Sequence, residues 1–118
     1  MQQNSGQDTC AEPAIVMTRI TAKWRPSILR LLHDEPRRFG ALRSGIPAIS
    51  ERMLVYSLRE LERDGIVLRT ALSMKPPHVI YSLTAFGAGC ARHIEALLDY
   101  LATPSEAIAS TRPPPRER

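Results

Sequence analysis

The stretch from Arg37 to Thr84 constrains the fold of this chain more than any other part of its sequence. It predicts a short helix over residues 39–44, a turn over 45–49 that contains Gly-Ile-Pro, and a longer helix that begins after Ser50. Because glycine and proline both interrupt a helix, this turn separates two helices rather than bending one. Two helices joined by such a short turn are predicted to form a helix-turn-helix.

The second helix of this pair has clear sequence signals at both ends. Ser50 is expected to cap its N-terminus by accepting an amide hydrogen bond, and Glu51 suits the positive end of the helix. Gly65 is expected to end the helix in a left-handed conformation. Between these ends, leucines recur at the spacing of one buried stripe: Leu54, Leu58 and Leu61. This pattern predicts an amphipathic helix with its other side in solvent.

A hairpin is predicted directly after this helix. Residues 66–70 and 78–83 are rich in β-forming side chains, and they bracket a proline-containing loop, 71–77. A helix-turn-helix followed by a two-stranded hairpin is the element order of a winged helix-turn-helix, whose second helix enters a DNA groove. The sequence therefore predicts a mainly α-helical, α+β fold with a two-stranded wing.

Further helices are expected on both sides of this unit. Residues 13–22 and 24–32 each carry a proline in the first turn, where the missing amide is tolerated. A last helix is expected to run from its N-cap Thr84 to about residue 101. It carries an apolar stripe along one side: Cys90, Ile94, Leu97 and Leu101.

The length and composition predict one globular domain. The chain has 118 residues, of which 43% are hydrophobic, enough for a single modest core. We expect the domain over residues 11–102, between a disordered arm, 1–10, and a disordered, proline-rich and charged tail, 103–118. Because no apolar run approaches the roughly 20 residues of a membrane span, and the N-terminus lacks a signal-peptide pattern, we expect a cytoplasmic location and no membrane partner.

Positive charge is concentrated on the predicted helix-turn-helix. The whole chain has a net charge of +4, but residues 19–75 alone contain 12 Lys and Arg residues and 6 Asp and Glu residues. Such a distribution suits the neutralisation of DNA phosphates. The alternative is that these charges only solvate helix surfaces.

The residues needed for catalysis or metal binding are missing from the sequence. Cys10, Cys90 and three scattered histidines have neither the spacing of a zinc site nor that of a disulfide framework. The chain also lacks a nucleophile with its base, paired catalytic carboxylates and a glycine-rich phosphate loop. We therefore expect no enzymatic activity, no cofactor and no metal.

The solvent side of the second helix is the candidate DNA-reading surface. If the leucine stripe faces inward, this side carries Glu51, Arg52, Val55, Tyr56, Arg59 and Arg63. Arg52 is placed to read guanine by a bidentate contact, and Val55 or Tyr56 to pack on a thymine methyl or reach a phosphate. Arg59 is better placed for the DNA backbone. The alternative is that Arg59 and Arg63 only pair with neighbouring acidic residues.

Other residues of the unit are predicted to support this surface. Polar and basic side chains lie around the turn and in the hairpin, and those expected to contact DNA are Arg38, Arg43, Ser44, Ser50, Lys75 and His78. Residues around the turn would hold phosphates, while the hairpin loop would reach a neighbouring groove or the backbone. Simple solvation remains the alternative for the residues of the hairpin.

A set of short motifs over about residues 10–101 resembles the HxlR-type winged helix-turn-helix regulators, a family of the MarR-like superfamily. These motifs are Lys23-Trp24, Ile28-Leu29, Pro36-Arg37-Arg38-Phe39, Leu42, Ile46-Pro47-x-Ile49-Ser50-x-Arg52-Met53-Leu54, Leu58-Arg59-Glu60-Leu61, Asp64-Gly65 and Pro77-x-Val79-x-Tyr81-Ser82-Leu83-Thr84-x-x-Gly87. The chain departs from the family at Ala22, commonly glycine, and at the Arg25-Pro26 pair. Both departures concern the start of a helix outside the candidate DNA surface.

The resemblance implies a homodimeric transcription regulator, here expected to be a repressor, whose terminal helices form the dimer interface. Its two recognition helices would read the half-sites of a near-palindromic DNA operator. Cys10 lies where the family has a cysteine that senses oxidants, quinones or aldehydes in several members. A nearby helix N-terminus favours its thiolate, and Glu12 opposes it. Cys90 is expected to pack in the dimer interface, with a Cys10–Cys90 disulfide between subunits as an alternative redox switch.

Two other functions are compatible with parts of this pattern. A winged helix can bind a protein instead of DNA, but its exposed helix side would then be apolar or acidic rather than arginine-rich. A DNA-binding regulator can also respond to a small ligand in the dimer cleft instead of a thiol. Replacing Cys10 by serine would leave regulation intact in that case, and abolish it if the thiol is the sensor.

Overall fold

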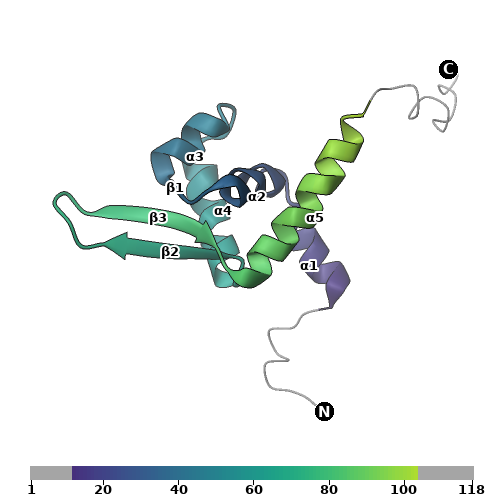
Figure 1. Ribbon diagram of the computed structural model, residues 1–118, viewed down its shortest axis with the longest axis horizontal. Helices are drawn as coiled ribbons and strands as arrows, with labels where there is room; N and C mark the ends of the chain where they lie inside the picture. Colours follow the sequence, from purple (N-terminus) through teal and green to yellow (C-terminus); the bar gives the residue numbers. More distant parts are fainter. Residues whose placement is uncertain (1–11, 104–118) are drawn as a thin grey trace, which may run out of the picture.

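The computed structural model describes residues 12–103, which form five helices and one small sheet (Figure 1). In chain order the elements are α1 (Pro13–Ile20), α2 (Arg25–Asp34), β1 (Arg37–Arg38), α3 (Phe39–Gly45), α4 (Glu51–Arg63), β2 (Val67–Leu72), β3 (His78–Leu83) and α5 (Ala85–Leu101). The segments predicted to be disordered, 1–10 and 103–118, lie outside the described residues except for Thr103. No helix within residues 12–103 is long and apolar enough to cross a membrane.

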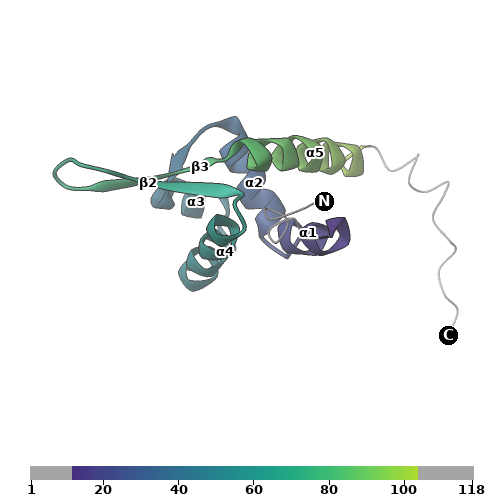
Figure 2. The same ribbon diagram turned by 90° about the horizontal axis from the view of Figure 1, so that it is seen from below.

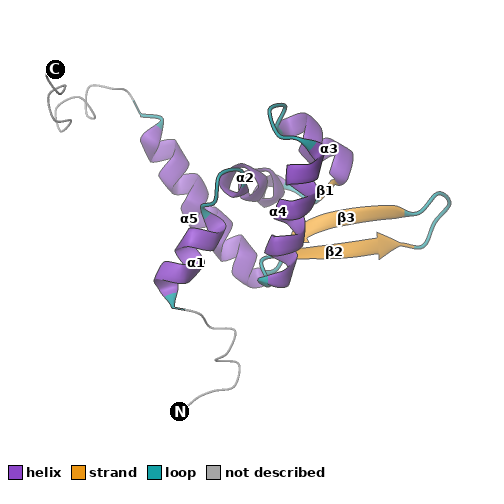
Figure 3. Ribbon diagram, turned by 180° about the vertical axis from the view of Figure 1, so that it is seen from behind, coloured by secondary structure: helices purple, strands orange, loops and turns teal. Residues whose placement is uncertain are grey.

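The sheet is antiparallel and has the strand order β1-β3-β2 (Figure 3). Its third strand, β1, was not expected: Arg37 and Arg38 pair with Tyr81 and Ile80 of β3. The predicted bounds of the first hairpin strand were also wrong, since β2 begins one residue later and continues to Leu72. The connecting loop is therefore shorter than expected, and β2 and β3 project as one long wing (Figure 1).

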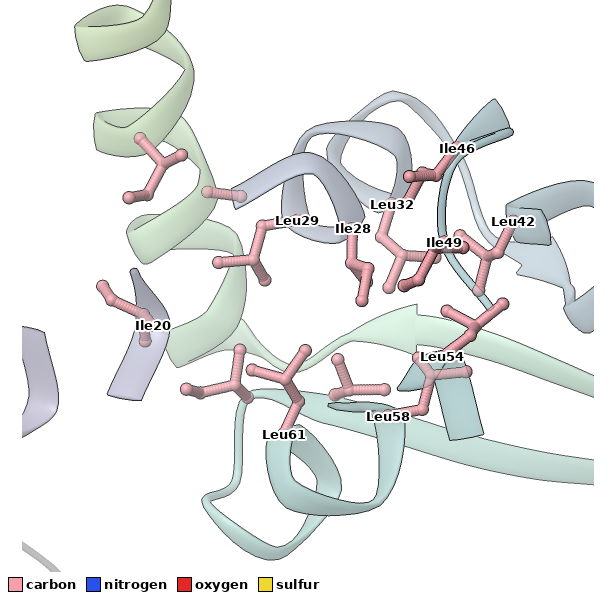
Figure 4. Packing of buried hydrophobic residues seen from close by; sticks show 14 residues of the cluster. Ile20, Ile28, Leu29, Leu32, Leu42, Ile46, Ile49, Leu54, Leu58 and Leu61 are labelled. Atoms are coloured by element: carbon pink, nitrogen blue, oxygen red, sulfur yellow. The ribbon is translucent and has the colours of Figure 1, made fainter. Parts of the chain in front are cut away.

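The hydrophobic core lies where α2, α3, α4, the base of the wing and α5 meet (Figure 4). The leucine stripe predicted for α4 is confirmed, because Leu54, Leu58 and Leu61 are all buried in it. Trp24 and Phe39 pack against its edge, as expected for core-associated aromatics. Burial of this one stripe fixes which side of α4 is left for a partner.

The two ends of α4 also confirm the prediction. The Ser50 hydroxyl accepts a hydrogen bond of 3.0 Å from the Met53 amide. At the other end, Gly65 has a φ of 78°, and the Ile66 amide donates to the Leu61 carbonyl at 2.9 Å. This pair of features is a Schellman ending, which turns the chain from the helix directly into β2. The helix and the wing are thereby held in a fixed relation.

The terminal helices lie at the end of the molecule opposite the wing (Figures 1 and 2). α1 ends at Ile20, two residues earlier than predicted. α5 approaches the start of β2 closely: a Cβ on Gly87 would lie 2.0 Å from the Ile66 carbonyl oxygen. Of the apolar stripe predicted on α5, Ile94 is buried, whereas Leu97 and Leu101 are 50% and 57% exposed. Only part of that stripe therefore contributes to the core of this chain.

Candidate nucleic-acid interface

The side of α4 that faces away from the core forms one continuous surface. Five side chains line a shallow hollow there: Glu51, Arg52, Val55, Tyr56 and Arg59. Both arginines are exposed, Tyr56 is 55% exposed and Val55 is half-buried. Figure 2 shows α4 projecting from the body of the molecule below the sheet. The surface predicted from the helical spacing is thus formed by a protruding helix, which is the shape a DNA groove requires.

Ion pairing divides the arginines of α4 into two groups. An Nη atom of Arg63 lies 2.8 Å from Glu60 Oε1, so Arg63 pairs with a neighbouring acidic residue. The sequence left this pairing open as the alternative to a DNA contact. Arg52 and Arg59 have no ion pair with any residue in the described part of the chain. The acidic residues near the end of α4 are engaged elsewhere, because Arg19 of α1 contacts both Glu60 and Asp64. Within the described residues, two positive charges are therefore left without an acidic partner on the exposed side of α4.

These two free guanidinium groups and their neighbours have complementary capacities. A guanidinium offers a planar set of donors that matches a phosphate or the edge of guanine. Val55 and Tyr56 lie between Arg52 and Arg59 in the sequence and provide apolar contact area beside them. The surface can thus combine phosphate neutralisation with base contact.

The turn before α4 is braced by Arg43, for which we had expected only a phosphate contact. Its Nε donates to the Ile49 carbonyl at 3.3 Å, and an Nη atom lies 3.5 Å from Glu51. Arg43 thereby ties α3 to the first turn of α4. Ser44 is exposed at the end of α3, where the sequence placed it beside the turn.

The two arginines of β1 differ in their surroundings. Arg37 is half-buried and donates to the Leu31 carbonyl and to Asp34. Arg38 is exposed and has no ion pair within the described range. Of this pair, Arg38 is the one whose charge has no partner within residues 12–103, and its predicted phosphate contact stays a prediction.

The two candidate residues of the wing also differ. Lys75 is exposed in the loop that joins β2 to β3. His78 begins β3 opposite Leu72, and its Nδ1 is buried without a hydrogen-bond partner in the described structure. The wing extends away from α4 rather than folding over it (Figure 1). The structure therefore separates the wing residues from the surface on α4.

Of the two cysteines, Cys10 lies outside the described residues. Cys90 is half-buried on α5, and burial raises the pKa of its thiol above the ordinary value. A raised pKa reduces the thiolate fraction, which is the nucleophilic form. Burial therefore lowers the reactivity expected of the Cys90 thiol, and its predicted redox role stays a prediction. Within residues 12–103, no three His, Cys, Asp or Glu side chains gather as a metal ion would need.

Comparison with known proteins agrees with this geometry. Residues 19–108 match the HxlR-like helix-turn-helix family. The chain belongs to this family. It is a DNA-binding transcriptional regulator of the HxlR/MarR type, and its relatives are regulators rather than enzymes.

Two bacterial relatives illustrate the extent of the similarity. The HTH-type transcriptional regulator YtfH of Escherichia coli is 41% identical over 86 residues, which cover 73% of this chain and 68% of YtfH. The HTH-type transcriptional regulator YodB of Bacillus subtilis is 31% identical over 106 residues, which cover 87% of this chain and 95% of YodB. The similarity to YodB thus extends over nearly the whole of both proteins.

Two solved structures have the same fold. The redox regulator HypR in its reduced form superposes with a TM-score of 0.74 at 33% identity, covering 84% of this chain and 99% of HypR. Diamide-treated YodB from Bacillus subtilis superposes with a TM-score of 0.69 at 32% identity, covering 76% of this chain and 91% of YodB. HypR is thus described as a redox regulator, and the YodB structure was solved after treatment with diamide, which oxidises thiols.

Proposed function

We propose that this protein acts in the cytoplasm as a homodimeric repressor that reads a near-palindromic DNA operator with α4 of each protomer. The observation that carries the proposal is the free arginine pair on α4. Within residues 12–103, Arg52 and Arg59 stay unpaired while Arg63 and Arg19 occupy the carboxylates of Glu60 and Asp64. An arginine-rich, protruding helix favours DNA over a protein partner, because a protein-binding surface would be apolar or acidic there.

Exposed apolar side chains on the terminal helices support the dimer. Large hydrophobic residues on α1 and α5 that are at least half exposed are Ile15, Met17, Phe86, Leu97, Tyr100 and Leu101. A soluble monomer rarely exposes so many on two helices, whereas a subunit interface buries them. A two-fold dimer built on these helices presents two copies of α4, which explains why the operator is expected to be nearly palindromic.

Analytical ultracentrifugation tests the dimer. We expect Leu97→Glu to shift the wild-type dimer to a monomer, because a charge is placed in the interface. The matched control is Arg92→Glu, which introduces the same side chain on α5 at an already charged and exposed position. A wild-type monomer, or equal effects of both substitutions, contradicts the proposed interface.

Cys10 is the proposed sensor of the regulator. Support comes from its position ahead of α1 in the sequence, from the poor reactivity expected of Cys90, and from the redox regulator HypR as a structural relative. Modification of Cys10 would shift the dimer helices and change the distance between the two copies of α4. Cys90 would pack in the dimer interface.

Fluorescence anisotropy tests DNA binding and thiol control together. The full chain is titrated onto DNA from upstream of its own gene, with a shuffled duplex as control, both reduced and after diamide. Diamide takes up two protons and two electrons as two thiols join in a disulfide. We expect preference for the upstream DNA, weakened by diamide in the wild type and not in Cys10→Ser. Preference that diamide leaves unchanged contradicts thiol control and favours a small ligand in the dimer cleft; no preference for any duplex contradicts the regulator.

A further inference from the structure

One side chain of α1 holds the end of the helix that reads DNA. The Nε of Arg19 donates to Asp64 at 2.6 Å, and one of its Nη atoms donates to Glu60 at 3.0 Å. Both carboxylates belong to the C-terminal end of α4, more than 40 residues away in the sequence. Figure 2 shows α1 and α4 on the same side of the molecule, below the sheet and α5. Arg19 thus joins a terminal helix to the recognition helix.

This contact is important for α1 because little else attaches that helix to the body. Ile20 is its one buried side chain, and Val16 packs at the edge of the core. The last turn of α1 is held from a second direction, since the buried Arg25 of α2 donates to the Arg19 carbonyl at 2.8 Å. Both the backbone and the side chain of Arg19 are therefore fixed.

The two carboxylates restrict α4 in more than one respect. Glu60 and Asp64 are four residues apart, so they lie one above the other on the same side of the helix. Two contacts one turn apart define the axial position of α4 and also its rotation about its own axis. At 100° per residue, Glu60 points to a different side from Arg59, so Arg19 can set this rotation without touching DNA.

The contact of Arg19 with Glu60 and Asp64 is also better shielded from solvent than an ordinary surface ion pair. The side chains of Glu60 and Asp64 are 16% and 19% exposed, and that of Arg19 is 36% exposed. The hydrogen bond and negative charge of Asp64 raise the pKa of Arg19 above its ordinary value, so the guanidinium stays charged. Water and salt screen such a pair less than a fully exposed one.

We propose that Arg19 is a positioning residue for DNA reading, which couples α1, and with it the dimer axis, to the rotation of α4. This inference rests on the proposed function, because the distance between two half-sites matters only to a DNA-binding dimer. A displacement of α1 reaches α4 through the Glu60 and Asp64 contacts. The residue therefore sets the spacing of half-sites that the dimer accepts, while Arg52 and Arg59 make the contacts.

The test measures selectivity for spacing rather than affinity alone. Wild type, Arg19→Gln and Arg19→Lys are titrated onto a duplex that the wild type selects from a random pool, and onto duplexes with one base pair added or removed between half-sites. The matched control is Arg63→Gln, which removes an ion pair of the same Glu60 within α4 and leaves α1 attached.

We expect Arg19→Gln to reduce the discrimination between spacings by about fivefold or more, a typical coupling between two sites. Arg63→Gln should keep the wild-type discrimination. Arg19→Lys should fall between them, because an ammonium keeps the charge but not the fork that reaches two carboxylates. Equal weakening on every duplex by Arg19→Gln would mean that the residue has only a structural role, and would overturn the proposal.

A second readout needs no DNA and separates this inference from the proposed function. Hydrogen exchange of the full chain should rise in Arg19→Gln both in α1 and at the Asp64 amide, which is bonded to the Glu60 carbonyl. Arg63→Gln should leave α1 unchanged. If the wild type selects no duplex, the proposed function fails; unchanged exchange in Arg19→Gln overturns the coupling whatever the DNA result.

Discussion

Removing the three arginines of α4 one at a time should affect DNA binding very unequally. Arg52→Ala and Arg59→Ala each remove a charge that has no partner within residues 12–103, whereas Arg63→Ala removes one already paired with Glu60. All three residues are exposed, so none of the substitutions opens a cavity. Differences between the variants therefore report on DNA contacts rather than on folding.

The expected sizes follow from the kind of contact that each side chain makes. A bidentate contact between Arg52 and a base is worth about 1–3 kcal/mol, so its loss from both protomers costs about 2–6 kcal/mol in operator binding. This corresponds to a weakening of about 30-fold or more. A phosphate contact by Arg59 contributes about 0.9 to the salt slope, so its loss from a dimer lowers that slope by about 1.8. Arg63→Ala should change affinity by less than about threefold, as for an exposed ion pair.

Fluorescence anisotropy between about 50 and 200 mM salt separates these effects, since it gives both affinity and salt slope. Arg52→Ala should lose the preference for operator over shuffled DNA, and Arg59→Ala should weaken binding to both duplexes alike. Circular dichroism confirms that each variant is folded. The reasoning is refuted if Arg63→Ala weakens binding as much as Arg52→Ala, because the unpaired arginines would then have no special role.

Three further predictions concern the framework of the site. Gly87→Ala should destabilise the chain by about 2 kcal/mol or more in urea unfolding, because its Cβ meets the Ile66 carbonyl at 2.0 Å; Gly89→Ala, with nothing within 4 Å, should stabilise α5 by about 0.5–1 kcal/mol. Similar effects of the two substitutions would contradict the close approach of α5 to β2. Ser50→Ala should cost about 1 kcal/mol through loss of the cap on the Met53 amide, and an unchanged urea midpoint would show that the cap is dispensable. In a Cys10→Ser background, iodoacetamide should alkylate Cys90 more slowly in the folded chain than in urea, because burial raises its pKa. The raised pKa also means that the neutral Cys90 thiol stabilises the fold below the unfolded-state pKa, and that this contribution is lost as pH rises through the folded-state value. Faster alkylation in the folded chain would contradict the raised pKa.

Helix α4 could be predicted from sequence because its signals are local. Ser50 and Gly65 mark its ends by their own backbone preferences, and the leucine spacing identifies its buried side. The exposed surface with Arg52 and Arg59 follows from that spacing alone. Helix α4 is therefore specified by residues within it or next to it.

The features that the sequence analysis missed depend on contacts between distant residues. Strand β1 has two residues, too few to show alternation, and it exists because β3 offers its edge to Arg37 and Arg38. The contact of Arg19 with Asp64 joins helices that nothing in the sequence connects. The apolar stripe of α5 was visible, but its division between Ile94, which is buried, and Leu97, which is exposed, depends on how α5 packs.

Selection from a pool of random DNA duplexes by the full chain tests the central claim most directly. The account predicts enrichment of two inverted copies of one half-site, with centres about 10 base pairs or a multiple of that apart. The enriched sequence should lose its advantage with Arg52→Ala and keep it with Arg63→Ala. Enrichment of no motif, or of a motif that Arg52→Ala reads as well as the wild type, would contradict sequence reading by α4.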